Sequence, residues 1–393
     1  MKITDIKTFC VDANWRNLVF VKVYTDEGIT GVGECTLETR DRSVIATVED
    51  YKRYVIGQDP NNIEKIWNTI YRDGYWGTGP VDMSALSAIE QALWDIVGKK
   101  FGAPVYKLLG GAVRDKIKVY ANGWYFGLTT PKEHAEKVGE LMEKGFQAFK
   151  WDPFRIASRE ISHEDLEYAI ECVAEVRKVA GANVDLLIEG HGRFNVRNAI
   201  LTAKALAQFN PLFYEEPIPQ DNYHALKKVA DLSGVSIAAG ERCYSIYQYR
   251  ELLSHQAVDT IQPDLSHSGG ILSLKKIAAM AETHYVAVAP HNASGPVHTA
   301  ATMQVDLTIN NLLIQEFFPC DEEKCPWIHT IVDHPLKPVD GYVTLSDRPG
   351  LGLDIVEDVI AAHPPKERPV YSLYSEDSFL LTGVGETTDQ SVL

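Results

Sequence analysis

The chain has 393 residues and a formal net charge of −16, with 45% hydrophobic and 23% charged residues. This length exceeds that of one ordinary domain and allows a large core, and the negative charge argues against nucleic acids and anionic membrane surfaces as partners. A small anionic substrate is not excluded, because a bound cation can reverse the local field.

The first fifteen residues have no secretory pattern, and no apolar run approaches the roughly 18–20 residues of a membrane span. The six cysteines are scattered along the chain, as is typical of reduced thiols and not of a disulfide framework. We therefore expect a cytoplasmic protein with neither a membrane nor a nucleic-acid partner.

Residues 1–115 are expected to form a small α+β domain. Residues 17–24 are rich in β-forming side chains, Thr25–Gly28 predicts a turn, and residues 29–34 return as a second strand. The pattern is helical from about Ser43 to Lys100, and the nearly apolar stretch Met83–Val97 predicts a buried helix.

From residue 117 onward, short apolar runs alternate with amphipathic stretches. Strands are expected at residues 117–121, 146–150, 184–188, 212–214, 235–238, 260–262, 285–289 and 312–315, and helices at 131–144, 163–179, 196–209, 222–232 and 271–283, among others. Such alternation predicts a parallel sheet with helical crossovers, and about eight units favour a barrel over residues 116–325. Residues 326–393 lack the alternation and are expected to run back over the first domain.

An ionisable side chain follows most of these strands at intervals of 23 to 27 residues, about one strand–helix unit each. The series is Glu189, Glu215, Glu241, Asp264, His291 and Glu316. Because the carboxyl ends of barrel strands converge on one face, where barrel enzymes have their active sites, we expect these six groups around one mouth.

Three consecutive carboxylates in this series, Glu189, Glu215 and Glu241, would crowd negative charge. A hard divalent cation compensates such charge, and Mg²⁺ suits oxygen ligands while keeping waters that substrate oxygens can replace. One of these acids alone would more simply cap the following helix. All three in register favour a Mg²⁺ site.

Two histidines belong to the same region. His291 comes one strand after Asp264, close enough for a carboxylate–imidazole pair that orients the ring and raises its basicity. His191 stands two residues after the first carboxylate of the series, and Lys150 and Asp152 end the second strand.

These motifs resemble the enolase superfamily, in its mandelate racemase group and within that the galactonate/gluconate dehydratase branch. The matching segments, in order, are Gly33-Glu34, Ser84–Gly98, Leu108–Gly111, Lys150–Phe154, Glu189–Phe194, Glu215–Ile218, Gly240–Arg242, Ile261–Gly270 and Ala289–Asn292. Each is weak alone, but their order and spacing over nearly the whole chain are specific.

The resemblance implies a (β/α)7β barrel of TIM type with an N-terminal α+β capping domain that the C-terminal tail completes. It implies Mg²⁺ on Glu189, Glu215 and Glu241, and abstraction of the proton next to a substrate carboxylate to give a metal-stabilised enediolate. A metal is needed there because such a proton is very weakly acidic.

The branch of the family is indicated by Lys150-Trp-Asp152, where the racemases carry Lys-x-Lys. The resemblance then implies His291 as the base for the C2 proton, oriented by Asp264, and His191 as the acid for the departing 3-hydroxyl. Glu316 and Lys150 would bind and neutralise the substrate carboxylate. The expected activity is that of a hydro-lyase, which dehydrates a sugar acid (an aldonate or aldarate) to a 2-keto-3-deoxy acid.

Three further residues are expected to contact the substrate: Asp152, Arg193 and Trp76, the last within the aromatic loop Tyr71–Gly79. One position departs from the family pattern, because many relatives have Asp where this chain has Glu189. Relatives are often homo-oligomers, frequently octamers, and we expect a homo-oligomer here.

Two other functions remain open at this stage. A racemase or epimerase needs a base on each face of C2, and His191 and His291 could serve. A non-catalytic sugar-acid binding protein on the same fold would keep the ligand sites without turnover. A zinc hydrolase barrel would require His-x-His after the first barrel strand, where the chain has Tyr120-Ala-Asn122.

Overall fold

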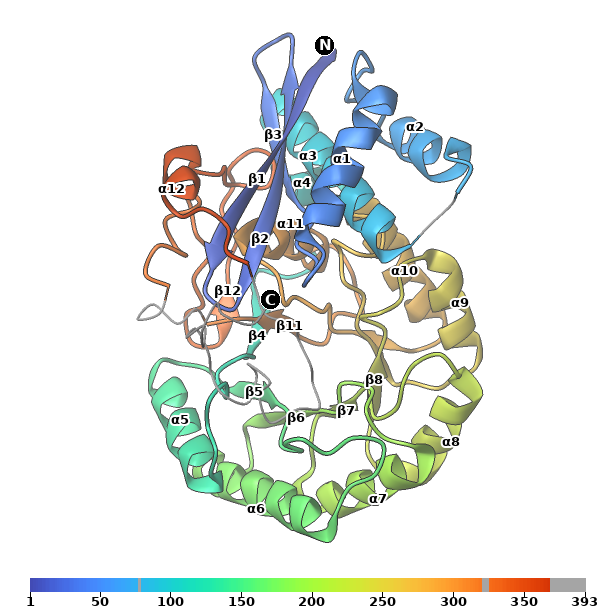
Figure 1. Ribbon diagram of the computed structural model, residues 1–393, viewed down its shortest axis with the longest axis vertical. Helices are drawn as coiled ribbons and strands as arrows, with labels where there is room; N and C mark the ends of the chain where they lie inside the picture. The colour runs from blue at the N-terminus through green and yellow to red at the C-terminus, as the bar shows by residue number, and fades with distance from the viewer. Residues whose placement is uncertain (77–78, 320–324, 368–393) are drawn as a thin grey trace.

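The computed structural model describes residues 1–76, 79–319 and 325–367. It shows a mixed α/β fold in which an N-terminal group of strands and helices lies over one end of a ring of strands and helices (Figure 1). Among the described residues, no helix is long and apolar enough to cross a membrane.

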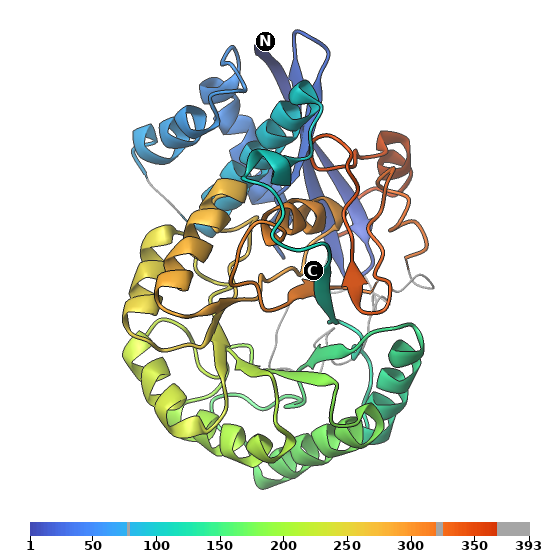
Figure 2. The same ribbon diagram turned by 180° about the vertical axis from the view of Figure 1, so that it is seen from behind.

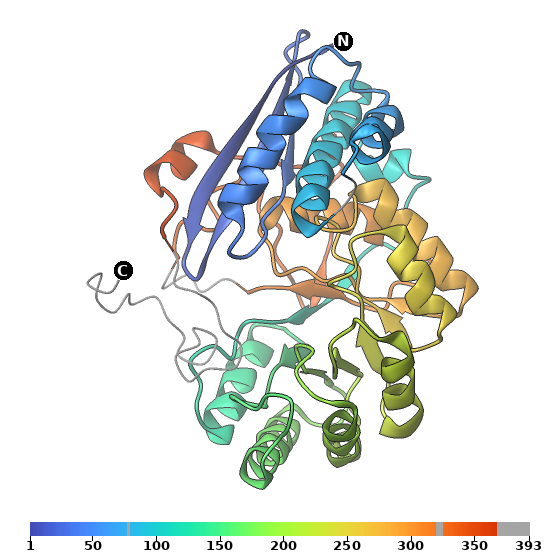
Figure 3. The same ribbon diagram turned by 45° about the vertical axis from the view of Figure 1, so that its right-hand side comes forward.

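The N-terminal strands form a three-stranded antiparallel sheet in the order β1 (Ile3–Ala13), β2 (Arg16–Thr25) and β3 (Thr30–Glu34). Helices α1 (Asp41–Val55), α2 (Ile63–Asn68) and α3 (Pro80–Phe101) accompany it, with a π-helical turn η1 (Thr69–Asp73) and a short α4 (Val105–Leu108). These elements enclose an apolar cluster of their own, and Figure 3 shows α1 and α3 lying along one face of the sheet.

Helix α3 is the buried helix that the sequence predicts. It begins with Pro80 at its first turn and ends at Gly102, whose left-handed φ of 62° suits a glycine cap. Its close contact with β3 depends on glycines, because a Cβ atom at Gly31 or Gly33 would lie 2.0 Å from the carbonyl oxygen of Ala92 or Ala88.

The second group is a curled parallel sheet, as predicted. Its strands are β4 (Ile117–Ala121), β5 (Ala148–Trp151), β6 (Asp185–Glu189), β7 (Phe213–Glu215), β8 (Ile237–Ala239), β9 (Thr260–Ile261), β10 (Ala287–Val288) and β11 (Gln315–Phe317). Neighbours in sequence pair in order from β4 to β10, and β11 pairs with β4. Val288 in β10 also bridges to Leu312 just before β11, so the sheet curls back toward its start.

Helices cover the outside of this sheet in an arc (Figure 2). They are α5 (Pro131–Glu143), α6 (His163–Ala180), α7 (Val196–Leu206) with the 3₁₀ turn η2 (Ala207–Phe209), α8 (Tyr223–Ser233), α9 (Ile246–Ser254), α10 (Ile271–Thr283) and α11 (Pro296–Asp306). The five helices expected from the sequence are present, and α9 and α11 are additional. The last strand lies later than expected, so Glu316 is inside β11 and does not follow it.

The described part of the C-terminal segment runs back to the N-terminal sheet, through β12 (Tyr342–Val343), which pairs with β4, and α12 (Glu357–Ala362). The backbone N–H of Asp12 donates to His363 O at 3.0 Å, and Trp327 stacks on the His363 ring at 4.1 Å. The domain limits 1–115, 116–325 and 326–393 stay predictions, and residues 320–324 and 368–393 lie outside the described residues.

The glycine contact between β3 and α3 generates the first prediction. Gly33→Ala should lower the free energy of unfolding by about 1–3 kcal/mol, because the methyl group would overlap the Ala88 carbonyl. Gly139→Ala in α5 is the control, since its Cβ would meet Val179 at an ordinary 3.6 Å. This substitution should stabilise the helix by about 0.5–1 kcal/mol. Urea unfolding of both variants measures the difference, and equal stabilities would contradict the packing account.

Candidate active site

Three carboxylates gather at the carboxyl ends of neighbouring strands. Glu189 and Glu215 are the last residues of β6 and β7 and face each other in the strand register, and Glu241 comes two residues after β8. One carboxylate oxygen from each lies within 4.8 Å of the others. The parallel strands therefore bring together the three residues that the sequence spacing predicts to converge.

Lys150, in β5, is the cation at the base of this cluster, with only 2% of its side chain exposed. Its Nζ lies 2.8 Å from Glu215 Oε1, 2.9 Å from Glu316 Oε1 and 3.3 Å from Glu189 Oε2. Burial opposes its charge, but Glu215 and Glu316 raise the pKa of Lys150 well above its usual value. One ammonium group is thus shared by three carboxylates.

The carboxylates differ in how well their charge is compensated. Burial and the nearby Glu189 raise the pKa of Glu215 well above its ordinary value, and burial raises the pKa of Glu189 to about 7. For Glu241 burial acts in the same upward direction, but His291 and Arg242 outweigh it and lower the pKa to about 2. The cluster therefore holds more potential negative charge than Lys150 neutralises.

The donor set fits a hard divalent cation. Oxygens on opposite sides of a Mg²⁺ ion lie about 4.2 Å apart, and the oxygens of these three carboxylates lie within 4.8 Å of one another. The raised pKa values of Glu189 and Glu215 agree with this fit, because a nearby cation would favour their ionised forms.

On one side of the cluster stands a histidine–carboxylate pair. His291, three residues after β10, places Nδ1 2.8 Å from Asp264 Oδ2, and its Nε2 lies 3.5 Å from Glu241 Oε2. Burial disfavours its charge, but Glu241 and Glu316 raise the pKa of His291 well above its ordinary value. The next residue, Asn292, donates its backbone N–H to Glu316 Oε2 at 2.6 Å, which fixes the loop beside β11.

A second histidine–carboxylate pair stands on the other side, toward β5. His191 Nδ1 lies 2.7 Å from Asp152 Oδ2, and the backbone N–H of His191 donates to Glu189 Oε1 at 2.6 Å. His191 has a φ of 49°, a left-handed conformation that is uncommon for a residue with a side chain. Arg193 also donates to Asp152, and these contacts outweigh burial to lower the pKa of Asp152.

The remaining two residues expected at the site lie differently. Arg193 is buried, and its guanidinium donates to the carbonyl oxygens of Gly190, Arg155 and Ala157 as well as to Asp152. Trp76 is 89% exposed and packs edge-on against Tyr75. The structure thus places Arg193 behind the His191 pair and Trp76 on the surface of the N-terminal group.

Two residues of the site were not singled out from the sequence. Asn122, just after β4, donates its side-chain N–H to Glu316 Oε1 at 2.6 Å. Glu216 is buried, and its Oε2 lies 3.0 Å from Arg242 Nη2. Burial and the nearby Glu241 raise the pKa of Glu216 to about 8. Asn122 and Glu216 both come directly after a strand. Their position at a strand end is the feature of the sequence that could have identified them.

Comparison with known proteins agrees with this geometry. The family model for the mandelate racemase/muconate lactonizing enzyme N-terminal domain matches residues 6–110, and the enolase C-terminal domain-like model matches residues 133–359. A solved member of the enolase superfamily from Salmonella Typhimurium superposes with a TM-score of 0.88 at 31% identity, covering 92% of this chain and 98% of that one.

Among curated proteins, the D-galactonate dehydratase of Pectobacterium atrosepticum is 38% identical over 365 residues, which is 92% of this chain and 94% of that protein. The D-galactonate dehydratase of Ralstonia pickettii is 38% identical over 374 residues, 94% of this chain and 96% of that protein. This similarity over most of both chains identifies an enzyme of the hydro-lyase class. The chain belongs to the mandelate racemase/muconate lactonizing enzyme family of the enolase superfamily.

Proposed function

We propose that the protein is a Mg²⁺-dependent sugar-acid dehydratase that converts an aldonate or aldarate to its 2-keto-3-deoxy acid. One observation carries the proposal: two carboxylate-paired histidines, His191 and His291, flank the three-carboxylate cluster along the sheet. Dehydration needs a base and an acid in such an arrangement. The curated D-galactonate dehydratases support the same class of substrate.

Glu189, Glu215 and Glu241 would hold the metal ion, as the spread of their oxygens and the excess of negative charge allow. Members of the enolase superfamily generally use a divalent metal, and Mg²⁺ fits an all-oxygen donor set. When bound, the ion would supply positive charge next to the substrate carboxylate, where negative charge develops as the C2 proton leaves.

His291 is the proposed base. Its contact with Asp264 engages Nδ1 and leaves Nε2 directed toward the carboxylate cluster, 3.5 Å from Glu241. His291 would be neutral when a cation bound at Glu241 offsets the negative charge that raises its pKa. In that form it takes the C2 proton on Nε2, and the electron pair of the C2–H bond is left on the substrate next to its carboxylate. Asp264 orients the ring and stabilises the imidazolium that forms.

His191 is the proposed acid. Asp152 engages its Nδ1, so Nε2 can donate a proton to the 3-hydroxyl group as the C3–O bond breaks and water leaves. The electron pair from C2 forms the C2–C3 double bond of an enol, which becomes the 2-keto acid when C3 gains a proton and the C2 hydroxyl group loses one. Arg193 holds Asp152 from behind.

The remaining roles concern binding. Lys150 and Glu316, joined by a 2.9 Å ion pair, would neutralise and hydrogen-bond the substrate carboxylate. Asp152 and Arg193 would act on the substrate through their contacts at His191, and the predicted substrate contact of Trp76 would come from the N-terminal group. In this proposal the curled sheet is a TIM-type barrel and the N-terminal α+β group is its cap.

Epimerisation is the second candidate, because the same paired histidines could exchange a proton on both faces of C2. The two reactions differ in what His191 does after the first proton transfer. In dehydration it protonates a leaving hydroxyl group, and in epimerisation it protonates carbon.

The roles of the two histidines give the second prediction. A panel of aldonic and aldaric acids with Mg²⁺ first identifies the acid that the wild-type protein converts. On that acid, His291→Asn should lower the rates of 2-keto acid formation and of C2 proton exchange in heavy water by at least about 10²-fold. His191→Asn should lose 2-keto acid formation but retain exchange, because the base is intact. The control is His255→Asn, which changes a partly buried histidine that contacts His224 and Tyr223 outside the site.

An inverted hydroxy acid as the product would move the assignment to epimerisation. Binding of an acid with neither product nor exchange would instead identify a binding protein.

The carboxylate cluster gives the third prediction. Glu215→Gln keeps the side-chain shape but removes a charged ligand, so the affinity for Mg²⁺ measured by calorimetry should fall by at least the roughly tenfold to hundredfold typical of changes around metal sites. Glu216→Gln makes the same substitution at the neighbouring buried carboxyl group and should have a much smaller effect. Equal losses in the two variants would show that net charge, and not ligation, sets the affinity.

A further inference from the structure

The helices that cover the parallel sheet begin in two different ways. Each helix from α5 to α9 has its own side-chain cap, in which Thr130, Ser162, Asn195, Asn222 or Ser245 accepts a backbone N–H of the first turn. Helices α10 and α11 instead begin at glycines, Gly270 and Gly295, without a side-chain cap of their own. The first N–H groups of a helix need acceptors, so these two helices must find theirs elsewhere.

For α11 the acceptor is Glu34, the last residue of β3 in the N-terminal group. Its Oε1 accepts the backbone N–H of Gly295 at 2.6 Å and the hydroxyl of Thr36 at 2.7 Å, and its Oε2 accepts the backbone N–H of His298 at 2.9 Å. Glu34 has no exposed surface. Gly295 makes room for it, because a Cβ atom there would lie 2.7 Å from Glu34 Oε1.

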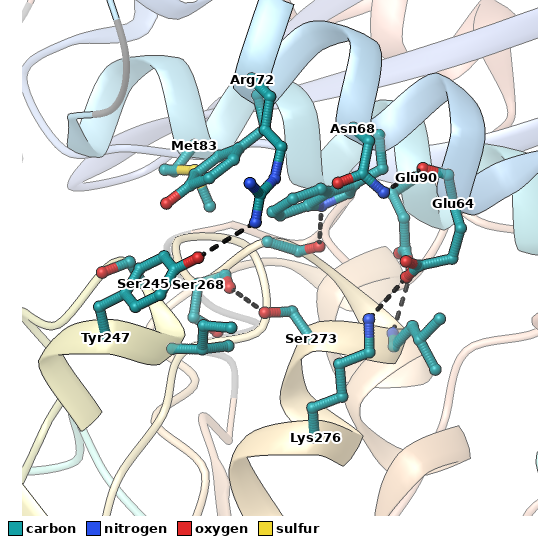
Figure 4. A pocket seen from close by; sticks show the side chains of 15 residues that line it. Glu64, Asn68, Arg72, Met83, Glu90, Ser245, Tyr247, Ser268, Ser273 and Lys276 are labelled. Carbon is teal, nitrogen blue, oxygen red and sulfur yellow. Dashed lines mark hydrogen bonds and ion pairs between the residues drawn. The ribbon is translucent and has the colours of Figure 1, made fainter. Parts of the chain in front are cut away.

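For α10 the acceptor is Glu90, in the middle of α3. Its Oε2 accepts the backbone N–H of Ile271 at 2.8 Å, and its Oε1 accepts the N–H of Leu272 at 3.0 Å and the Trp94 indole N–H at 2.8 Å. A Cβ atom at Gly270 would lie 2.1 Å from Glu90 Oε2. Figure 4 shows Glu90 at the wall of a cavity of about 240 Å³ between α3 and α10, beside Ser273 and Lys276.

The two helices are those that follow Asp264 and His291. The loop from Asp264 to α10 is bound to the N-terminal group along its length: Gln91 Nε2 donates to Ser266 Oγ, Ser84 Oγ lies 2.8 Å from His267 Nδ1, and the N–H of Gly269 donates to Ser87 Oγ. On the other loop, Arg16 donates to Ser294 O at 3.0 Å.

The α11 cap also lies close to the histidine–carboxylate pair. The backbone of His298 is held by Glu34, and its ring Nδ1 lies 3.8 Å from Asp264 Oδ1, on the carboxylate that also contacts His291.

We propose that Glu34 and Glu90 are positioning residues of the active site, which hold α10 and α11 from the N-terminal group and thereby set the geometry of the Asp264–His291 pair. The inference rests on the proposed role of His291 as the base for the C2 proton. It assigns the N-terminal group a part in the proton transfer as well as in covering the site.

Glutamine tests this assignment well in both positions. Each carboxylate accepts three hydrogen bonds on its two oxygens, whereas glutamine replaces one oxygen with an NH₂ group that would face another donor. Water cannot readily replace the lost acceptor at Glu34, which has no exposed surface, and Glu90 is only 2% exposed at the edge of its cavity. The first turn of the helix, and the loop before it, must then shift.

Asp95→Asn is the matched control. Asp95 is also a fully buried carboxylate of α3, and it accepts from Val32 N–H, Leu351 N–H and Lys99, none of which belongs to the loops of Asp264 or His291. Asp95→Asn should lose stability as Glu34→Gln and Glu90→Gln do, but it should not slow proton transfer.

The experiment measures kcat, KM, C2 proton exchange in heavy water, Mg²⁺ affinity and thermal stability of the full-length protein, at a temperature where all variants are folded. Glu34→Gln and Glu90→Gln should lower kcat and exchange by roughly tenfold to a hundredfold, the effect of a displacement of about 1 Å, with KM and Mg²⁺ affinity near wild type. Asp95→Asn should retain wild-type kcat and exchange. If all three variants share the same kcat and exchange, the two glutamates are merely structural and the inference is wrong.

Crystal structures of the same variants separate this inference from the proposed function. If the wild-type protein exchanges no C2 proton on any acid, the proposed function fails, and the His291–Asp264 contact still tests the positioning. The inference requires that contact to lengthen from 2.8 Å in Glu34→Gln or Glu90→Gln but not in Asp95→Asn. If Glu34→Gln does not fold, Thr36→Val, which removes one donor to Glu34, replaces it.

Discussion

The concentration of buried carboxylates at the carboxyl ends of the parallel strands is the constraint on which the rest of the site depends. Glu189, Glu215 and Glu316 share the single ammonium group of Lys150, and the raised pKa of Glu215 shows that this cation is not sufficient. A protein that keeps such a cluster either protonates one of the carboxylates or supplies further positive charge. The arrangement is therefore costly for folding and useful for binding a metal ion together with an anionic substrate.

The sequence predicted most of the sheet and the residues at its strand ends. The interval of about one strand–helix unit between Glu189 and Glu215, and between Asp264 and His291, is set by the fold itself, because consecutive parallel strands place equivalent positions side by side. Helix α11 was not named, because its residues are buried on every side and so lack the polar face that makes a helix periodic. Asp152 was assigned to the substrate, whereas the structure pairs it with His191 through a loop whose course spacing does not reveal.

Contacts between distant parts of the chain explain what the sequence could not indicate. Glu34 and Gly295 are 261 positions apart, and nothing in the local pattern of either residue names the other. The glycines at the starts of α10 and α11 were visible, but a glycine before a helix is compatible with many backbone needs. Only the position of each carboxylate against its helix shows that the glycine is required for close approach.

Glu189 connects the metal cluster to the acid side of the site. Its Oε1 accepts the backbone N–H of His191, a residue held at a φ of 49°, so the proposed ligand also caps the turn that presents the proposed acid. Aspartate at this position would be one methylene shorter, so its carboxylate would lie closer to the strand end. The glutamate thus fits a turn in which His191 is fixed from three directions: by Glu189 at its N–H, by Asp152 at its ring and by Arg242 at its carbonyl oxygen. The proposed acid is therefore positioned by residues of the parallel-sheet group alone, whereas the loops of the proposed base are contacted by carboxylates from the N-terminal group.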